Sequence, residues 1–229
     1  MSKPEMTVKK KIGLFDLDHT LIPFDSDYEW NEFTIGLGWR DGVEFKRRNA
    51  VFYEQYRLGT LDLRDYVRFA TEAIREQGAI NSIAAHGRFM GAVVQKGIKR
   101  QALELVQSHQ RDGAEVVIVT ATNEFVTRPI AEAFGVTELI AVELERDAQG
   151  RLTGEIKGTP SFREGKVIRV EQWLAARGLG WDDVETTFYT DSMNDLALLE
   201  KATHPVATNP DERLRALAAE RGWRILDLF

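Results

Sequence analysis

The amino-acid sequence predicts an α/β protein: a doubly wound parallel sheet with an inserted set of helices. Two observations indicate the sheet. Near-continuous runs of β-branched and aromatic residues suit strands that are buried on both faces, and helical patterns alternate with these runs along the chain. A third observation indicates the insert, because residues 25–94 show no strand pattern and only amphipathic stretches with helical periodicity.

Three buried strands are expected in the core. The first covers Ile12 to Phe15 and is bounded by Asp16 and by the turn residues at Pro23. The second covers Ala114 to Thr120, and the third covers Thr186 to Asp191. A polar residue follows the first strand directly and ends each of the other two.

Four helices are expected between and after these strands, at Ile98 to Arg111, Glu124 to Phe134, Gly165 to Arg177 and Met193 to Lys201. A glycine follows each of the first three, and glycine readily adopts the left-handed conformation that ends a helix. Alternating residues between Leu139 and Gly158 flank a turn and predict a β-hairpin.

The predicted elements form one Rossmann-like α/β core and one inserted all-helical cap. We expect the core to contain residues 1–23 and 95–229, and the cap to contain residues 24–94. A chain of 229 residues is long enough to bury a core of this size and to carry a small insert.

Composition excludes several functional classes. Hydrophobic residues make up 43% and charged residues 29% of the chain, close to the average of globular proteins. The sequence contains no apolar run near the roughly 20 residues that span a bilayer, and its polar start "MSKPEMTVKKK" lacks the apolar segment of a signal peptide. We therefore expect a soluble, cytoplasmic monomer or homodimer with no membrane partner.

The charge and the cysteine content of the chain exclude further functional classes. Cysteine is absent, which removes disulfides, thiolate nucleophiles and cysteine-bound metals. The four histidines lack metal-ligand spacing, so no zinc site is expected. Thirty basic and 36 acidic residues give a net charge of -6, which predicts no nonspecific binding of nucleic acid.

Chemically active residue types stand where the predicted strands end. Asp16, Thr120 and Asp191 end the three strands, and Asp195 lies one helical turn beyond Asp191. Lys166 opens the helix before the third strand. In open parallel sheets ligands bind outside the carboxyl ends of the strands, so these five residues are expected in one crevice.

Each of these residues has an ordinary structural explanation when it is taken alone. An aspartate at the end of a strand commonly caps a turn, a threonine suits a strand, and a lysine suits a solvated helix. Only the ordered set favours a shared chemical role over these explanations.

Four motifs carry a resemblance to a known family. "FDLDHT" matches a DxDxT motif, "IVTAT" a strand that ends in Ser or Thr, "EGKV" a lysine motif, and "TDSMNDLALL" a final DxxxD acidic motif. In this order they resemble the haloacid dehalogenase superfamily, and within it the phosphoserine phosphatase-like group, which carries a helical cap after the first motif. The resemblance covers essentially the whole chain, and four ordered motifs are far more specific than one.

The resemblance implies a magnesium-dependent phosphatase that hydrolyses a small phosphorylated metabolite. Asp16 would attack phosphorus and form an aspartyl-phosphate. Asp18 would protonate the leaving oxygen and then activate the water that breaks the intermediate. Magnesium would be held by the acidic set, with Asp16, Asp191 and the Asp18 backbone carbonyl as ligands and Asp195 assisting.

The resemblance also assigns the phosphate-binding residues, which would be Thr120, Ala121, Lys166 and Asn194. Ala121 stands where phosphoserine phosphatases often have glycine, and Thr190 and Ser192 depart from the glycines common around the final motif. The main-chain N–H donors are the same with these residues, so phosphate binding is not affected. The differences change the lining of the crevice and therefore the choice of substrate.

Substrate selection is expected to fall to the cap, through Asp25, Asp27, Arg57 and Arg64. Asp25 lies where phosphoserine phosphatases carry a substrate-binding glutamate, and an acid there would suit a substrate amine. A structural role at the start of a helix explains Asp25 equally well. A substrate carboxylate would need a cation such as Arg57 or Arg64.

Two substrates are considered. The segment "DSDYEW" resembles a branch of these phosphatases associated with histidinol phosphate, whose amine and imidazole would suit an acidic pocket with Tyr28 and Trp30. Histidinol phosphate is therefore favoured, and phosphoserine or another amino-alcohol phosphate is the alternative.

Three other functions are less consistent with the sequence. A dehalogenase lacks the second acid of the first motif, which is Asp18 here. A signalling receiver domain carries its phosphorylated aspartate on the third strand, in a much shorter chain. A catalytically silent phosphate-binding protein would not need to retain every chemical residue.

Overall fold

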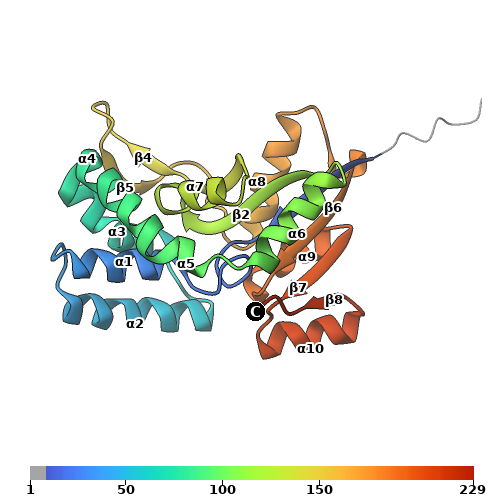
Figure 1. Ribbon diagram of the computed structural model, residues 1–229, viewed down its shortest axis with the longest axis horizontal. Coiled ribbons are helices and arrows are strands. Elements are labelled where there is room, and N and C mark those ends of the chain that lie inside the picture. The colour runs from blue at the N-terminus through green and yellow to red at the C-terminus, as the bar shows by residue number, and fades with distance from the viewer. Residues whose placement is uncertain (1–8) are drawn as a thin grey trace, which may run out of the picture.

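The computed structural model describes residues 9–229, and its centre is a six-stranded parallel sheet with the strand order β3-β2-β1-β6-β7-β8. Helices cover both faces of the sheet (Figure 1). The doubly wound α/β fold is therefore confirmed. Its strands are β1 (Lys10–Phe15), β2 (Glu115–Asn123), β3 (Glu138–Val142), β6 (Val184–Thr190), β7 (His204–Thr208) and β8 (Arg224–Leu226).

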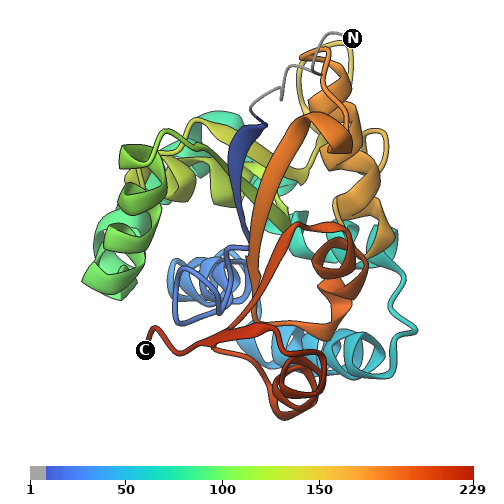
Figure 2. The same cartoon turned by 90° about the vertical axis from the view of Figure 1, so that its right-hand side faces the viewer.

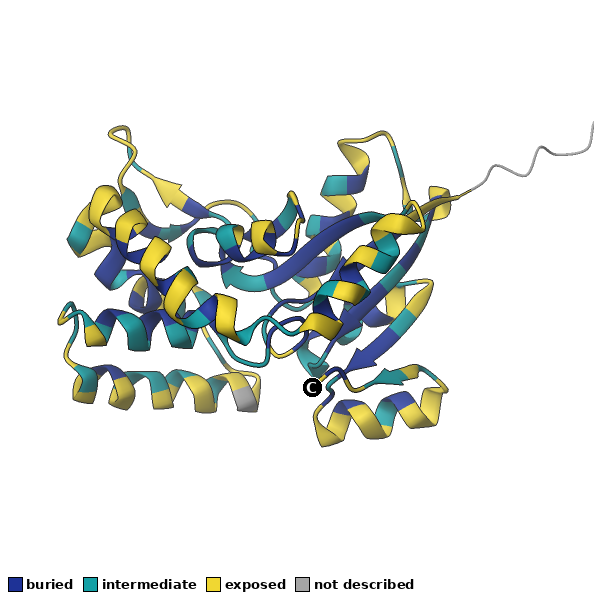
Figure 3. Cartoon of the chain, in the orientation of Figure 1, coloured by how far each residue is buried: buried dark blue, intermediate teal, exposed yellow. Residues whose placement is uncertain are grey.

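Alternate residues of the strands supply two separate hydrophobic clusters, one on each face of the sheet. Phe15 and Ile118 point to the face covered by α6 and α7, whereas Leu14 and Val117 point to the other face. Figure 3 shows the central strands buried between these layers. The helices around the sheet are α6 (Arg100–Arg111), α7 (Glu124–Ala133), α8 (Glu164–Ala175), α9 (Leu196–Lys201) and α10 (Glu212–Arg221), with short 3-10 turns η2 (Trp181–Asp183) and η3 (Met193–Asp195).

The insert after β1 is helical, as the sequence predicts. Aspartates begin three of its helices: Asp25, Asp41 and Asp62 each accept hydrogen bonds from main-chain N–H groups of the first turn. Its elements are α1 (Ser26–Gly36), α2 (Gly42–Leu58), α3 (Leu63–Ala70), α4 (Glu72–Phe89), the π-helical turn η1 (Met90–Val94) and α5 (Gln95–Gly97). The boundaries of the core and of the cap as separate domains remain a prediction.

Trp30 of α1 joins the insert to the sheet. Its indole is fully buried, and its ring centroid lies 5.6 Å from that of Phe89 on α4 and 5.7 Å from that of Phe125 on α7. The same cluster contains Phe15 of the central strand. The insert and the sheet therefore share one hydrophobic core on this face.

The structure corrects three details of the predicted secondary structure. The turn between residues 139 and 158 does form a hairpin, from β4 (Leu144–Arg146) and β5 (Leu152–Ile156), but the preceding residues form β3 of the main sheet. Strand β2 runs to Asn123, beyond the expected end at Thr120. The sequence analysis also did not identify β7, α10 and β8, which complete the sheet (Figure 2).

No helix of the described residues 9–229 is long and apolar enough to cross a membrane.

We expect the Gly165→Ala variant to be less stable than the wild type. A Cβ at Gly165 would stand 2.1 Å from the main-chain oxygen of Pro160, which cannot swing away as a side chain would. The resulting strain should lower the free energy of unfolding by about 1–3 kcal/mol in a urea titration. As a control, Gly87→Ala places a Cβ where the described structure has no neighbour within 4 Å. The control should be neutral or stabilising by up to about 1 kcal/mol, and equal losses in both variants would contradict this prediction.

Candidate active site

The carboxyl ends of β1, β2 and β6 lie side by side and bring the predicted residues to one edge of the sheet. Phe15 pairs with Ile118 of β2 and with Tyr189 of β6. Just beyond β1, the Asp16 N–H donates a hydrogen bond to the Tyr189 oxygen at 2.9 Å. Asp16 and Asp191 therefore emerge next to each other from adjacent strands.

Lys166 links two of the acids in the buried floor of the crevice. Its Nζ donates to Asp16 Oδ1 at 2.8 Å and to Asp195 Oδ2 at 2.7 Å, and only 2% of its side chain is exposed. Burial alone would lower the pKa of Lys166, but the two carboxylates more than offset burial and raise it. The ammonium group therefore stays charged and fixes both carboxylates in place.

Asp195 has a second partner, Thr190, whose hydroxyl donates to the same Oδ2 atom at 2.7 Å. This carboxylate is 4% exposed and is held by two donors. Asp195 therefore holds the Lys166 ammonium group in position through Oδ2, and its predicted place in the metal site stays a prediction.

Thr20 lies between the other two acids. Its hydroxyl is 3.3 Å from Asp16 Oδ2 and 3.2 Å from Asp191 Oδ1, and it accepts a hydrogen bond from the Asp191 N–H at 3.1 Å. The sequence analysis gave Thr20 no role, although it is the threonine of the DxDxT motif. That motif was the signal that could have identified it.

The floor of the crevice carries more negative than positive charge. Burial is the main cause that raises the pKa of Asp16 to about 6 and raises the pKa of Asp191 well above its usual range, and neighbouring carboxylates add to the effect. The one ammonium of Lys166 contacts only two of the carboxylates, Asp16 and Asp195. A divalent cation between Asp16 and Asp191 would relieve this repulsion.

The donor set fits magnesium better than a metal that requires many protein ligands. Among residues 9–229, no three His, Asp or Glu side chains converge as a metal-binding cluster. Two carboxylates, with the Asp18 backbone carbonyl that the resemblance assigns, would leave coordination positions for water. Magnesium is commonly held in this way, through one or two carboxylates and several waters.

The Asp18 side chain is turned away from Lys166 and is held by two other donors. Ser26 N–H at the start of α1 donates to its Oδ1 at 2.8 Å, and the Thr122 hydroxyl donates to its Oδ2 at 2.7 Å. Burial, followed by the nearby charge of Asp25, raises the pKa of Asp18 to about 8. The surroundings of Asp18 therefore favour its protonated form.

The predicted phosphate-binding residues lie along the same edge. Thr120 is buried, and its hydroxyl accepts the Thr122 N–H at 3.1 Å. Its main-chain oxygen accepts the Ser161 hydroxyl at 2.6 Å, which ties β2 to the loop before Lys166. Ala121 and Asn194 are half-buried beside Thr120 and Asp195 in the sequence.

The two cap aspartates occupy different environments. Asp25 caps α1 by accepting the Tyr28 N–H at 2.9 Å, and it also lies close enough to Asp18 to raise the pKa of that acid. Asp27 is 3% exposed and accepts hydrogen bonds from the Tyr66 hydroxyl at 2.6 Å and from Asn123 Nδ2 at 3.1 Å. Asp27 therefore connects the insert to the end of β2.

The structure describes the side chain of only one of the two cap arginines, Arg64. Arg64 is exposed in the first turn of α3, near Glu155, whose pKa it helps to lower. Arg57 belongs to α2, and its side chain lies outside the described part of the structure.

The far end of α2 also contacts the rim of the crevice. The Tyr56 hydroxyl lies 3.3 Å from Ser192 Oγ, next to Asp191. Arg163, at the start of the Lys166 helix, donates from Nη1 to the Gly59 oxygen at 3.0 Å. The insert therefore extends over the acidic residues.

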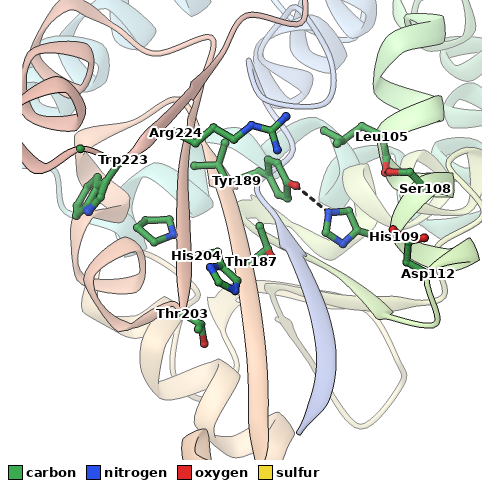
Figure 4. A pocket seen from close by; sticks show the side chains of 13 residues that line it. Leu105, Ser108, His109, Asp112, Thr187, Tyr189, Thr203, His204, Trp223 and Arg224 are labelled. Atoms are coloured by element: carbon green, nitrogen blue, oxygen red, sulfur yellow. Dashed lines mark hydrogen bonds between the residues drawn. The ribbon is translucent and has the colours of Figure 1, made fainter. Parts of the chain in front are cut away.

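A separate cavity of about 620 Å³ lies on the α6 side of β6, β7 and β8 (Figure 4). In its wall, His109 Nε2 lies 2.8 Å from the Tyr189 hydroxyl. His204 and Arg224, at the amino-terminal ends of β7 and β8, also line it. None of the predicted site residues does, so this cavity is distinct from the crevice at the carboxyl ends.

Comparison with known proteins identifies the family. The model of the haloacid dehalogenase-like hydrolases matches residues 14–200, and the chain therefore belongs to this family. It is 40% identical over 219 residues to a histidinol-phosphatase of Neisseria meningitidis, with 95% of this chain and 99% of that protein covered. These matches make the protein a phosphatase.

Two solved structures share the fold. A protein of unknown function from Bordetella pertussis has a TM-score of 0.91 and 46% sequence identity, with 97% of this chain and 100% of that chain covered. A substrate-bound phosphoserine phosphatase has a TM-score of 0.66 and 20% identity, with 96% and 93% covered. At this identity, the second likeness concerns the fold alone.

We expect the Asp27→Asn variant to have a weaker pH dependence of stability. Burial, and then the charge of Asp25, raise the pKa of Asp27 from 3.8 to about 7, against the hydrogen bonds from Tyr66 and Asn123 and the charge of Arg40. Between these values the folded state holds a proton that the unfolded state has released. The protonated Asp27 therefore adds to the free energy of unfolding at low pH, and this contribution is lost as the pH rises through 7.

Urea titrations at pH 5 and pH 8 measure this effect. The fall in the free energy of unfolding between the two values should be smaller in Asp27→Asn than in the wild type by about 2 kcal/mol. Asp182→Asn, which removes an exposed carboxylate, should behave as the wild type. An unchanged pH dependence in Asp27→Asn would show that Asp27 is ionised throughout.

Proposed function

We propose that the protein is a magnesium-dependent phosphomonoesterase that works through an aspartyl-phosphate on Asp16, with histidinol phosphate as its candidate substrate. One observation carries the proposal: Asp16 is buried and fixed by Lys166, while a second acid of the same motif, Asp18, is held apart from Lys166 with a raised pKa. Two carboxylates in different environments can take two different roles.

In the first step, a carboxylate oxygen of Asp16 attacks the phosphorus atom. The bond between phosphorus and the ester oxygen breaks, its electron pair goes to that oxygen, and Asp18 supplies the proton that makes it a neutral alcohol. In the second step Asp18, now ionised, takes a proton from a water molecule whose oxygen attacks phosphorus. The bond between phosphorus and the Asp16 oxygen breaks, and its electron pair returns to the Asp16 carboxylate. Inorganic phosphate leaves, and Asp18 is protonated again.

The surrounding residues bind and orient the phosphate. Lys166 supplies positive charge beside Asp16, and Asp195 with Thr190 holds Lys166 in position. Thr120, the main-chain N–H of Ala121 and Asn194 would donate to the phosphoryl oxygens. Asp16 and Asp191, with the Asp18 carbonyl, would hold Mg²⁺, which when bound neutralises charge on the phosphoryl group.

An amine-bearing substrate without a carboxylate agrees best with the charges of the insert. Asp25 places negative charge near Asp18. Arg40 and Arg48 of the insert are both paired with Glu72. The likeness to a protein named histidinol-phosphatase over nearly its whole length supports the same choice.

Phosphoserine or another amino-alcohol phosphate is the alternative within the same chemistry. A silent phosphate-binding protein is the alternative of another class. A cytoplasmic location and a monomeric or homodimeric state remain predictions.

We expect Asp16→Asn to abolish the hydrolysis of p-nitrophenyl phosphate, because the amide is a poor nucleophile and cannot form the aspartyl-phosphate. The activity should fall at least about 10³-fold, with an unchanged circular dichroism spectrum. Glu220→Gln, which alters an exposed acid of α10, is the control and should retain full activity. Substantial turnover by a folded Asp16→Asn variant would refute the mechanism.

We expect phosphate release to be most efficient with amine-bearing alcohol phosphates. A screen should compare histidinol phosphate, phosphoserine, ethanolamine phosphate and glycerol phosphate by kcat/KM. The Asp25→Asn variant should keep the N-cap of α1 but lose about 10-fold or more with the amine-bearing substrates, and much less with glycerol phosphate. Equal losses would leave Asp25 with only its capping role, and no release from any compound would favour the silent binding protein.

A further inference from the structure

Thr122 has a contact that the mechanism above does not use. It lies two residues beyond Thr120 near the end of β2, and its hydroxyl lies 2.7 Å from Asp18 Oδ2. This is a short contact between side chains 104 residues apart in the sequence. The partner in this contact, Asp18, is the acid that must deliver a proton to the leaving oxygen under the proposed function.

The two oxygens of Asp18 are fixed from opposite sides. The Ser26 N–H, at the start of the insert, holds Oδ1 at 2.8 Å, and Thr122, at the end of the sheet, holds Oδ2. A carboxyl group with one donor on each oxygen cannot rotate about its Cβ–Cγ bond without losing both hydrogen bonds. Thr122 therefore restricts the plane in which Asp18 presents its proton.

The position of Thr122 is itself fixed. Its main-chain N–H donates to the Thr120 hydroxyl at 3.1 Å. The next residue, Asn123, caps α7 by accepting the Val126 N–H and donates through Nδ2 to the buried Asp27. The segment that carries the Thr122 hydroxyl is thus held by Thr120 on one side and by Asp27 of the insert on the other.

We propose that Thr122 is a positioning residue for Asp18, and that its hydroxyl orients the carboxyl group for proton transfer to the leaving oxygen. The inference rests on the proposed function, because it needs Asp18 to act as the acid. A hydroxyl suits this role, since it can donate to Asp18 or accept from it and so keeps the contact when the proton moves. A main-chain N–H, such as that of Ser26, can only donate.

The leaving group provides the test. A leaving group that is itself a weak base, such as p-nitrophenolate, needs little protonation, whereas phenolate and alkoxides need much more. A misaligned acid should therefore slow the cleavage of phenyl phosphate and glycerol phosphate far more than that of p-nitrophenyl phosphate. The parameter to compare is kcat/KM, which reports the steps up to the first irreversible one.

We expect Thr122→Val, which replaces the hydroxyl by a methyl group of similar size, to lower kcat/KM about 10- to 100-fold for phenyl phosphate. For p-nitrophenyl phosphate the loss should stay below about 3-fold. Thr122→Ser retains the hydroxyl and should restore most of the activity toward phenyl phosphate. In the Asp18→Asn background, Thr122→Val should have almost no additional effect, because the group that it positions is gone.

Thr71→Val is the matched control. Thr71 is buried, and its hydroxyl donates to the Val67 oxygen at 2.7 Å within the insert, so this variant loses a buried hydroxyl without contact to Asp18. Thr71→Val should lower kcat/KM for phenyl phosphate and for p-nitrophenyl phosphate by the same factor, or leave both unchanged. The inference is overturned if Thr122→Val lowers both reactions equally, if Thr122→Ser fails to restore activity, or if the double variant shows additive losses.

Failure of the inference differs from failure of the proposed function. If the proposed function is wrong, the wild type releases no phosphate or Asp16→Asn remains active. If only the inference is wrong, the wild type is active and Asp16→Asn is inactive, while Thr122→Val retains the wild-type dependence on the leaving group.

Discussion

The contact of one buried ammonium group with two carboxylates is the constraint on which the rest of the crevice depends. Lys166 joins Asp16, at the end of β1, to Asp195, at the start of α9, and all three side chains are largely withdrawn from water. Withdrawing such charges is costly unless they are paired and hydrogen-bonded. The surrounding elements meet this condition: Thr190 satisfies Asp195, and Gly165 allows the loop at Pro160 to pass close to the helix that carries Lys166.

This arrangement also separates the two aspartates of the first motif. Asp16 is buried and faces charged neighbours, the Lys166 ammonium and the Asp191 carboxyl group. Asp18, two residues later, faces Thr122 and Ser26, where its partners are neutral donors. Neighbouring positions of one short motif therefore have different hydrogen-bond partners, and under the proposed function this difference would allow Asp16 to act as the nucleophile and Asp18 as the acid.

The sequence was sufficient for the fold class and for the residues at the strand ends, because both depend on local patterns. Hydrophobic runs identify the central strands, and motif order identifies Asp16, Lys166 and Asp191. Contacts between distant segments leave no such pattern: nothing near Thr122 indicates that it meets Asp18, and nothing near Asp27 indicates that Tyr66 and Asn123 bury it. Strands β7 and β8 were missed for another reason, since they are only five and three residues long and their sequences, "HPVAT" and "RIL", carry little periodicity.

The shared aromatic core around Trp30 attaches one part of the insert to the sheet more firmly than another. Helices α1 and α4 are fixed to the sheet side by Trp30, Phe89 and Phe125, so they cannot swing away without exposing a large apolar surface to water. The end of α2 is attached to the rim by the Tyr56 hydroxyl near Ser192, by the Tyr56 ring near Phe162, and by the hydrogen bond from Arg163 to the Gly59 oxygen. The two sides of the insert are therefore attached differently: α1 and α4 through the buried aromatic core, and the end of α2 through a few contacts at the rim of the crevice.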